Sequence, residues 1–180
     1  MKVIETGIEQ CVIIEPTLFQ DDRGFFLETF HHERYAEKLG IKESFVQDNH
    51  SYSKRGVLRG LHFQRNRPQG KLVRVMSGEV FDVAVDLRKK SSSFGKWIGV
   101  KLSGRNKKQL WVPAGFAHGF LVLSEHADFE YKCTSYYDPL DEGTIRWNDE
   151  VLGINWPLEC APVVSKKDAE APLFNEAFQR

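Results

Sequence analysis

The chain consists largely of short apolar segments, separated at regular spacing by turns rich in Gly, Pro and Ser. In segment 79–87, apolar residues fill both sets of alternating positions, which is typical of an inner strand covered on both faces. Many short strands joined by such turns predict an antiparallel β-sandwich or barrel. We expect strands at 12–15, 25–30, 45–51, 58–64, 71–76, 79–87, 97–102, 109–112, 118–123 and 129–135.

Helices are expected at only two places. Segment 31–39 is rich in Glu, Lys and Ala, and Gly40 follows where glycine commonly ends a helix. Near the C-terminus, Ser165 and Asp168 have the Ser-x-x-Asp spacing that opens a helix, which we predict over 168–178. The chain contains no repeat and no low-complexity linker, so we expect one domain over residues 1–180.

The composition argues against two classes of partner. The 25 basic and 25 acidic residues balance, so the basic surface typical of nucleic-acid binders is not expected. No apolar stretch approaches the roughly 18–20 residues of a membrane span, and the N-terminal residues lack a signal-peptide core. The three cysteines, Cys11, Cys133 and Cys160, are odd in number and widely separated, which favours free thiols and a cytoplasmic protein.

Segment 58–64, Leu-Arg-Gly-Leu-His-Phe-Gln, combines a cation, a glycine, an imidazole and an amide within one expected strand. Strict alternation would place Arg59 and His62 on opposite faces. Glycine inside a strand often marks a bulge, and a bulge at Gly60 would turn both side chains towards one pocket. A single histidine in a strand is more often structural than catalytic, so a chemical role for His62 requires partners elsewhere in the chain.

The other chemical patterns are mostly missing. The six histidines form neither His-x-His nor His-x-x-x-His, and His62 with His118 lacks a carboxylate at a suitable spacing, so no metal is expected. The chain has no Gly-x-Ser-x-Gly motif, no cysteine near a histidine, no phosphate loop and no dinucleotide fingerprint. Acid–base chemistry by side chains remains, with anion contacts expected from Arg23, Arg59, Lys71 and His118.

Three further residues have ordinary structural readings when each is taken alone. Lys71 would be a solvated surface lysine, and Tyr131 would be a core tyrosine with its hydroxyl at the rim of the core. Asp168 reads as a first-turn carboxylate that the helix dipole favours. The residue types by themselves do not decide between these readings and a catalytic role.

Several motifs resemble, in order and spacing, those of the dTDP-4-dehydrorhamnose 3,5-epimerase family of the cupin superfamily. Residues 113–120, Pro-Ala-Gly-Phe-Ala-His-Gly-Phe, are similar to the second cupin motif, Pro-x-Gly-x-x-His. The resemblance extends from about residue 13 to residue 172, and its other motifs lie at 22–26, 47–51, 57–64, 70–75, 138–139 and 153–157.

The resemblance implies a cupin-type jelly roll, all-β with a few short helices, that forms a homodimer and uses neither metal nor cofactor. Where a metal-binding cupin has His-x-His, this chain has His62-Phe63-Gln64. The implied substrate is a 4-keto-6-deoxy sugar on thymidine diphosphate, in the dTDP-L-rhamnose pathway that supplies polysaccharides. The ketone acidifies the hydrogens at C3 and C5, so a base can form an enolate that is reprotonated from the other face.

The resemblance also implies a role for each catalytic residue. His62 matches the base, and Asp168 matches the carboxylate that orients it. Lys71 matches the cation that stabilises the enolate oxygen, and Tyr131 matches the acid on the opposite face. A cation at Lys71 would also ease ionisation of Tyr131.

The substrate-binding positions implied by the family are spread along the chain. The strands that carry Arg23, Phe26 and Glu28 are expected to reach the partner subunit and serve its site. Relatives often have Trp within 136–138, where this chain has Tyr136-Tyr137. The full set is Arg23, Phe26, Glu28, Gln47, Asp48, Asn49, Arg59, Lys71, His118, Tyr137, Glu142 and Lys167.

Three other functions remain open at this point. The nearest is a related deoxysugar enzyme that inverts only C3 or C5, or a cupin 3,4-ketoisomerase. A cupin that binds the nucleotide sugar without turnover is a second, and a metal-dependent cupin oxygenase or isomerase is a third.

Overall fold

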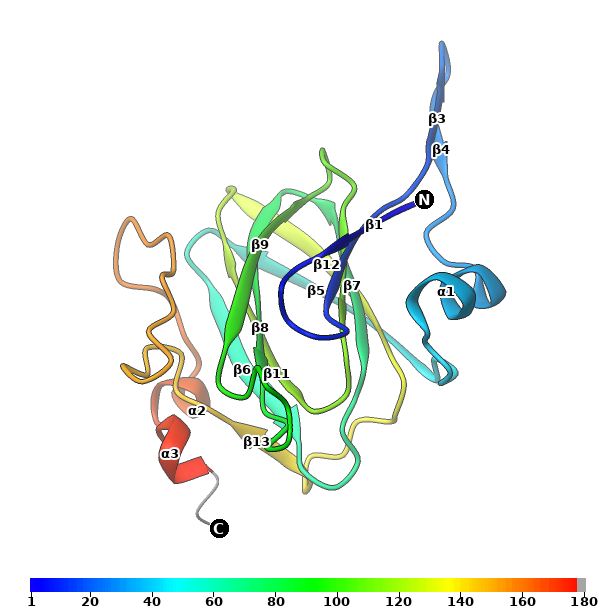
Figure 1. Cartoon of the computed structure of the whole chain (residues 1–180). Coiled ribbons are helices and arrows are strands. Elements are labelled where there is room, and N and C mark those ends of the chain that lie inside the picture. Colours follow the sequence, from blue (N-terminus) through cyan, green and yellow to red (C-terminus); the bar gives the residue numbers. More distant parts are fainter. Residues whose placement is uncertain (178–180) are drawn as a thin grey trace.

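The computed structural model describes residues 1–177 and shows two antiparallel sheets packed face to face (Figure 1). The six-stranded sheet has the order β1 (Lys2–Glu5), β2 (Val12–Glu15), β10 (Gln109–Val112), β7 (Lys71–Ser77), β12 (His126–Cys133) and β5 (Gln47–Lys54). The five-stranded sheet has the order β13 (Glu142–Thr144), β6 (Leu58–Gln64), β11 (Phe116–Val122), β8 (Glu79–Asp86) and β9 (Trp97–Ser103). The prediction of an all-β antiparallel fold is confirmed.

The inner faces of the two sheets share one apolar core. Phe120 of β11 and Phe129 of β12 stack at 4.3 Å between ring centroids, which joins one sheet to the other. Val73 and Val80 are fully buried in the same cluster. Burying each large apolar side chain contributes about 1.5–3 kcal/mol, so this layer fixes the spacing between the sheets.

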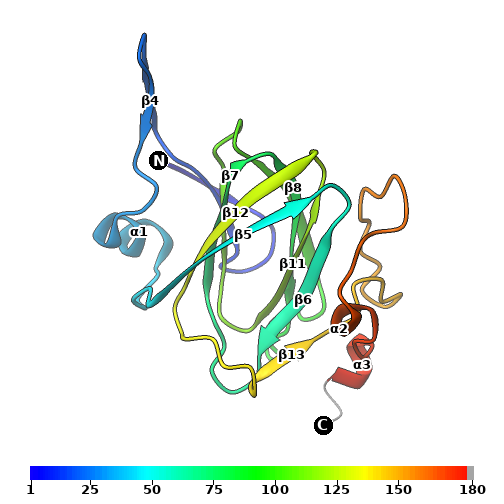
Figure 2. The same ribbon diagram turned by 180° about the vertical axis from the view of Figure 1, so that it is seen from behind.

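Each sheet is also partly covered on its outer face. Helix α1 (His32–Leu39) packs Tyr35 against Trp111 on the six-stranded sheet. On the other side, the C-terminal segment lays Trp156 and Phe174 over β6, β8 and β11 (Figure 2). No helix among the described residues is both long enough and apolar enough to span a membrane.

Helix α1 was predicted correctly from the residues at its two ends. It is capped by His31, whose side chain accepts a hydrogen bond from the Arg34 N–H, and it stops at Gly40 with φ of 67°. That left-handed conformation is one that glycine adopts without a steric penalty.

The C-terminal helix prediction was wrong in extent. The chain forms two short helices, α2 (Lys166–Ala169) and α3 (Phe174–Ala177), and residue 178 lies outside the described residues. Pro172 lies between them, and proline both lacks an N–H and disfavours helix at the preceding residue. The opening signal was correct, since Ser165 Oγ accepts a hydrogen bond from the Asp168 N–H at 3.1 Å, but the helix begins at Lys166, two residues before the predicted start.

Strand prediction missed the three short strands β1, β3 (Leu18–Asp21) and β13, and the strand expected over 25–30 ends at Leu27. That strand, β4 (Gly24–Leu27), pairs with β3 (Leu18–Asp21) in a separate hairpin. The hairpin projects away from the sandwich (Figures 1 and 2). We call β3 and β4 the N-terminal arm; it exposes Leu18, Phe19, Phe25 and Phe26 to solvent.

Strand β6 contains the predicted bulge. His62 is paired with His118 and Arg59 with Phe120, so Gly60 and Leu61 together face the single residue Gly119. Leu61 and its apolar neighbours on β6 point into the outer cluster under the C-terminal segment. Arg59 and His62 therefore both point towards the inside of the sandwich.

We expect Gly60→Ala to lower the free energy of unfolding by about 2–5 kcal/mol, measured by denaturant titration. A Cβ at Gly60 would lie 2.6 Å from the Gly119 Cα and 2.7 Å from the His118 carbonyl oxygen, neither of which can rotate away. The control is Gly24→Ala, because Gly24 has a similar φ, 128° against 120°, but nothing within 4 Å of its Cβ position. Equal losses in the two variants would show that backbone strain, and not the close approach, sets the cost.

Candidate active site

His62 is held by a carboxylate from the far end of the chain. Its Nε2 lies 2.7 Å from Oδ1 of Asp168, which α2 places against β6. The other carboxylate oxygen, Oδ2, accepts the Gly60 N–H at 3.3 Å. The bulge therefore has two effects, since it turns His62 inward and presents a backbone donor to Asp168.

The surroundings of Asp168 keep it ionised. Burial by itself would raise the pKa of this carboxyl, which is 3 % exposed. The hydrogen bond and charge of His62, with the Gly60 N–H, outweigh burial and hold the pKa of Asp168 below its usual value. An ionised carboxylate beside the imidazole favours the charged form that His62 takes after accepting a proton.

Lys71 and Tyr131 come from the facing sheet. The Lys71 Nζ lies 5.8 Å from the centroid of the Tyr131 ring, and both side chains are partly buried. Burial lowers the pKa of Lys71, although the nearby Cys133, Glu142 and Asp82 act in the opposite direction.

Tyr131 remains protonated, as an acid must be before it acts. Burial raises the pKa of Tyr131, and the cation that opposes this shift is Arg59. Arg59 is thus a cation that acts on Tyr131 alongside Lys71, which approaches its ring. The expectation that Lys71 eases ionisation of Tyr131 stays a prediction.

A second histidine–carboxylate pair lies deeper in the sandwich. The Nε2 of His118 is 3.0 Å from each carboxylate oxygen of Asp82, and both residues are buried. The imidazole of His118 stacks on Phe129 with 6.0 Å between centroids. Because β11 pairs with β6, His118 and His62 are direct cross-strand neighbours.

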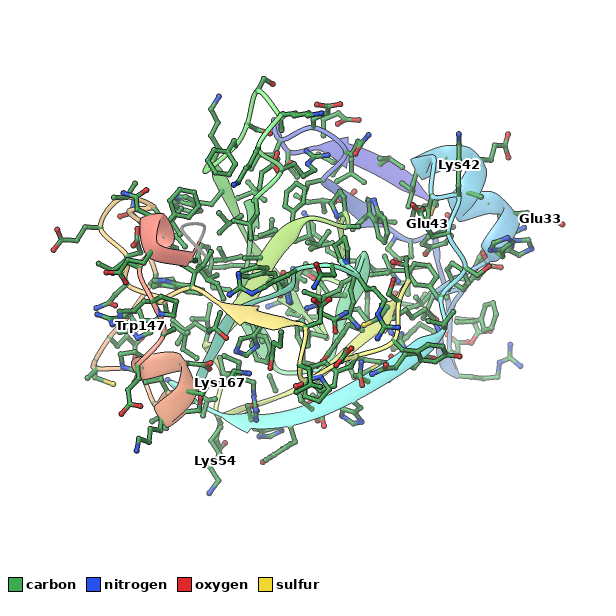
Figure 3. All side chains as sticks on the ribbon, turned by 90° about the horizontal axis from the view of Figure 1, so that it is seen from below. Glu33, Lys42, Glu43, Lys54, Trp147 and Lys167 are labelled. Atoms are coloured by element: carbon green, nitrogen blue, oxygen red, sulfur yellow. The ribbon has the colours of Figure 1, made fainter. Side chains whose placement is uncertain are left out.

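Polar side chains also gather where α2 meets β13. Glu142 contacts Lys167, and it accepts the hydroxyl of Tyr137 at 3.0 Å. Burial raises the pKa of Glu142, but Lys167 and Tyr137 outweigh burial, so the net pKa is lowered. Figure 3 shows Lys167 on α2, on the opposite side of the molecule from Glu33 on α1.

The sequence of this chain matches one known family over almost its whole length. The family model described as dTDP-4-dehydrorhamnose 3,5-epimerase matches residues 5–176. The chain belongs to that family.

Relatives of this epimerase family match along nearly their full length. The dTDP-4-dehydrorhamnose 3,5-epimerase of Salmonella typhimurium is 58% identical over 179 residues, covering 99% of this chain and 98% of the relative. A crystal structure of the Legionella pneumophila 3,5-epimerase in complex with dTDP-4-keto-L-rhamnose is 57% identical in sequence, with a TM-score of 0.95. The match covers 97% of this chain and 93% of the Legionella chain. A crystal structure of a 3′-monoepimerase of Streptomyces bikiniensis, in complex with dTDP-quinovose, is 33% identical in sequence, with a TM-score of 0.88. The match covers 95% of this chain and 87% of the Streptomyces chain.

Some of the binding residues expected from the epimerase family lie apart from His62 in this chain. Asp48 points to the outer face of β5 and pairs with Lys132, because strand alternation sends it away from Gln47 and Asn49. Arg23, on the N-terminal arm, pairs with Asp21 at the exposed tip.

The other two arm-side residues of the expected set lie near the base of the arm. Phe26 is 68% exposed, and Glu28 pairs with Arg34 of α1. They line a cavity of about 360 Å³ together with Phe19 and Tyr35. The arm and α1 lie on the opposite side of the sandwich from α2, which carries Asp168 (Figure 1).

Sequence reasoning missed two residues that hold side chains of the candidate site. Asp82 holds His118, and its only sequence signal is a carboxylate among the buried positions of an inner strand. Ser53 accepts a hydrogen bond from the Arg59 Nε at 3.0 Å, and no motif marks it. Within residues 1–177, no group of three His, Cys, Asp or Glu side chains could hold a metal ion.

We expect Asp168→Asn to lower the free energy of unfolding by about 1–3 kcal/mol near neutral pH. A carboxyl whose pKa is depressed in the folded state contributes stability above its unfolded pKa of about 3.9, and the contribution is lost as pH falls through the folded pKa. The difference between wild type and variant should therefore shrink below about pH 4 in urea titrations.

The matched control is Asp128→Asn. It breaks a histidine–carboxylate pair of similar length, 2.9 Å to His50, in which the histidine is 60% exposed. Such an exposed pair contributes about 0–1 kcal/mol. A loss in Asp168→Asn as small as in this control would contradict the buried coupling of His62 to Asp168.

Proposed function

We propose that this chain epimerises C3 and C5 of dTDP-4-dehydro-6-deoxy-D-glucose, giving dTDP-4-dehydro-L-rhamnose in the dTDP-L-rhamnose pathway. The observation that carries the proposal is that His62, held by Asp168, lies on one sheet, and Lys71 and Tyr131 lie on the facing sheet. The full-length similarity to named 3,5-epimerases supports the same reaction.

In this mechanism His62 removes the proton from the carbon beside the ketone. Its Nε2 is held by Asp168, which leaves Nδ1 as the ring nitrogen that faces the sugar. The electron pair moves onto the C4 oxygen as an enolate, and the ionised Asp168 stabilises the imidazolium that forms.

Lys71 stabilises the enolate oxygen, and Tyr131 returns a proton to the opposite face of the carbon. Because burial deprives the Lys71 ammonium of water, its charge acts strongly on a nearby oxyanion. One preorganised donor of this kind is worth about 100- to 1000-fold in rate. Proton transfer from Tyr131 inverts the carbon, and solvent then restores the protonation states.

The remaining residues of the pocket suit the nucleotide portion of the substrate. Arg59 and His118 border the side of the pocket nearest His62 and fit the sugar and diphosphate. The outer rim, formed by Gln47, Asn49, Tyr137, Glu142 and Lys167, fits the nucleoside.

Metal independence and a cytoplasmic location are also part of the proposal. The imidazoles of His62 and His118 are each engaged by a carboxylate through Nε2, the nitrogen most exposed to a ligand in many metal sites. Turnover that survives exhaustive chelation would support metal independence.

The deciding experiment is proton NMR of the sugar during turnover in deuterated water. We expect deuterium at both C3 and C5; incorporation at only one carbon would favour the single-carbon activity named for the Streptomyces relative. His62→Ala should reduce exchange by at least about 1000-fold while thymidine diphosphate still binds, because the base is lost and the nucleotide contacts remain.

The control for that variant is His50→Ala. His50 also pairs with an aspartate, but on the outer face of the six-stranded sheet. Its exchange rate should equal that of wild type. Exchange in His62→Ala at the rate of this control would remove His62 as the base.

We further propose that the chain acts as a homodimer in which each N-terminal arm completes the partner's site. Two observations support this arrangement. The arm exposes four large apolar side chains, which is unusual for a surface that faces water. The arm also projects away from the sandwich, on the side opposite α2, which carries Asp168 (Figure 1).

Mixing two inactive variants tests the shared site. If the arm serves the partner, dimers that combine an Arg23→Ala chain with a His62→Ala chain contain one site with both residues intact. Activity should then reappear after co-refolding, towards about one quarter of wild type for random pairing. If the arm acts within its own chain, every mixed site lacks one residue and no activity returns.

A further inference from the structure

Cys133 lies between two groups of the proposed site and has no role in the reaction described above. Its side chain is fully buried at the end of β12. In the sheet it is paired with Lys71 on one neighbouring strand and with Gln47 on the other. Directly opposed residues place their side chains on the same face, with Cβ atoms about 5 Å apart.

A chain of hydrogen bonds ends at the Cys133 sulfur. The Asn49 Nδ2 donates to Cys133 Sγ at 3.6 Å, and the Asn49 Oδ1 accepts from the Gln47 Nε2 at 3.0 Å. The Gln47 Oε1 in turn accepts the Tyr137 N–H at 2.9 Å. The sulfur thus fixes which way the Asn49 amide points, and through Gln47 it bears on the loop at Tyr137.

We propose that Cys133 is a positioning residue that orients the Asn49–Gln47 pair towards the nucleotide and places an uncharged side chain next to Lys71. The inference rests on the proposed function for the meaning of these contacts. It concerns a residue that touches no substrate, because the side chain is fully buried.

The absence of charge on the Cys133 side chain affects how Lys71 responds to charge on the substrate. Burial raises the pKa of the Cys133 thiol, so it is protonated at neutral pH even with a cation beside it, and it opposes the lowered pKa of Lys71 only at the higher pH where it ionises. The other titratable groups that face Lys71 are Tyr131 on the same strand as Cys133, Asp82 on β8 and Glu142 on β13. A neutral neighbour on β12 leaves the ammonium free to respond to charge that develops on the substrate.

The first test measures thymidine diphosphate binding by calorimetry, which does not depend on turnover. Cys133→Ala removes the acceptor of Asn49, so the dissociation constant should rise about 2- to 10-fold, the range for one neutral hydrogen bond. Cys133→Ser keeps an acceptor and should stay within about twofold of wild type. The control is Cys11→Ala, an equally buried thiol in the core between the sheets, with unchanged affinity expected.

The second test places a charge beside the cation. In Cys133→Asp the carboxylate should raise the pKa of Lys71, seen as slower reaction of its amine with acetic anhydride at a given pH, followed by mass spectrometry. The same variant should lose kcat by at least about tenfold with a smaller change in KM. Cys133→Ser should show the labelling profile of wild type.

The outcomes separate this inference from the proposed function. Unchanged nucleotide affinity in Cys133→Ala, or an unchanged Lys71 labelling profile in Cys133→Asp, would overturn the positioning role. A wild-type protein that binds thymidine diphosphate but exchanges no deuterium would overturn the proposed function and leave both Cys133 measurements valid.

Discussion

The arrangement of the proposed site depends on the hydrogen bond between His62 and Asp168. This bond connects β6, in the middle of the chain, to α2 near its C-terminus, across 106 residues. The bulge at Gly60 makes the contact possible, since it turns His62 inward and supplies an N–H to the same carboxylate. Ser165 starts α2 at the right place, so one cap and one glycine position the proposed base.

Much of the fold could be predicted because alternation and turn residues act locally. Strand β10 begins and ends where its pattern indicates, and Gly40 ends α1 as expected. The second helix was predicted too long because the opening signal at Ser165 was given more weight than Pro172. The short strands β1 and β13 carry little pattern of their own and exist because neighbouring strands offer backbone partners.

The site was less predictable than the fold because it depends on which faces meet. The bulge beside His62 could be predicted from one glycine, but no local pattern connects Asp82 to His118 or Ser53 to Arg59. Family resemblance supplied most of the proposed roles. It did not indicate that Asp48 faces outward, which follows from strand alternation, or that Arg59 is a cation that opposes the raised pKa of Tyr131.

The division of the pocket between two sheets has an evolutionary consequence. His62 and His118 stand on the five-stranded sheet, whereas Lys71 and Tyr131 stand on the six-stranded sheet. The gap between them is set by interior contacts such as the stack of Phe120 on Phe129. Substitutions in the core can therefore shift how the two faces of a sugar ring are presented without altering any reacting group, so stereochemical outcome can drift while the catalytic side chains stay the same.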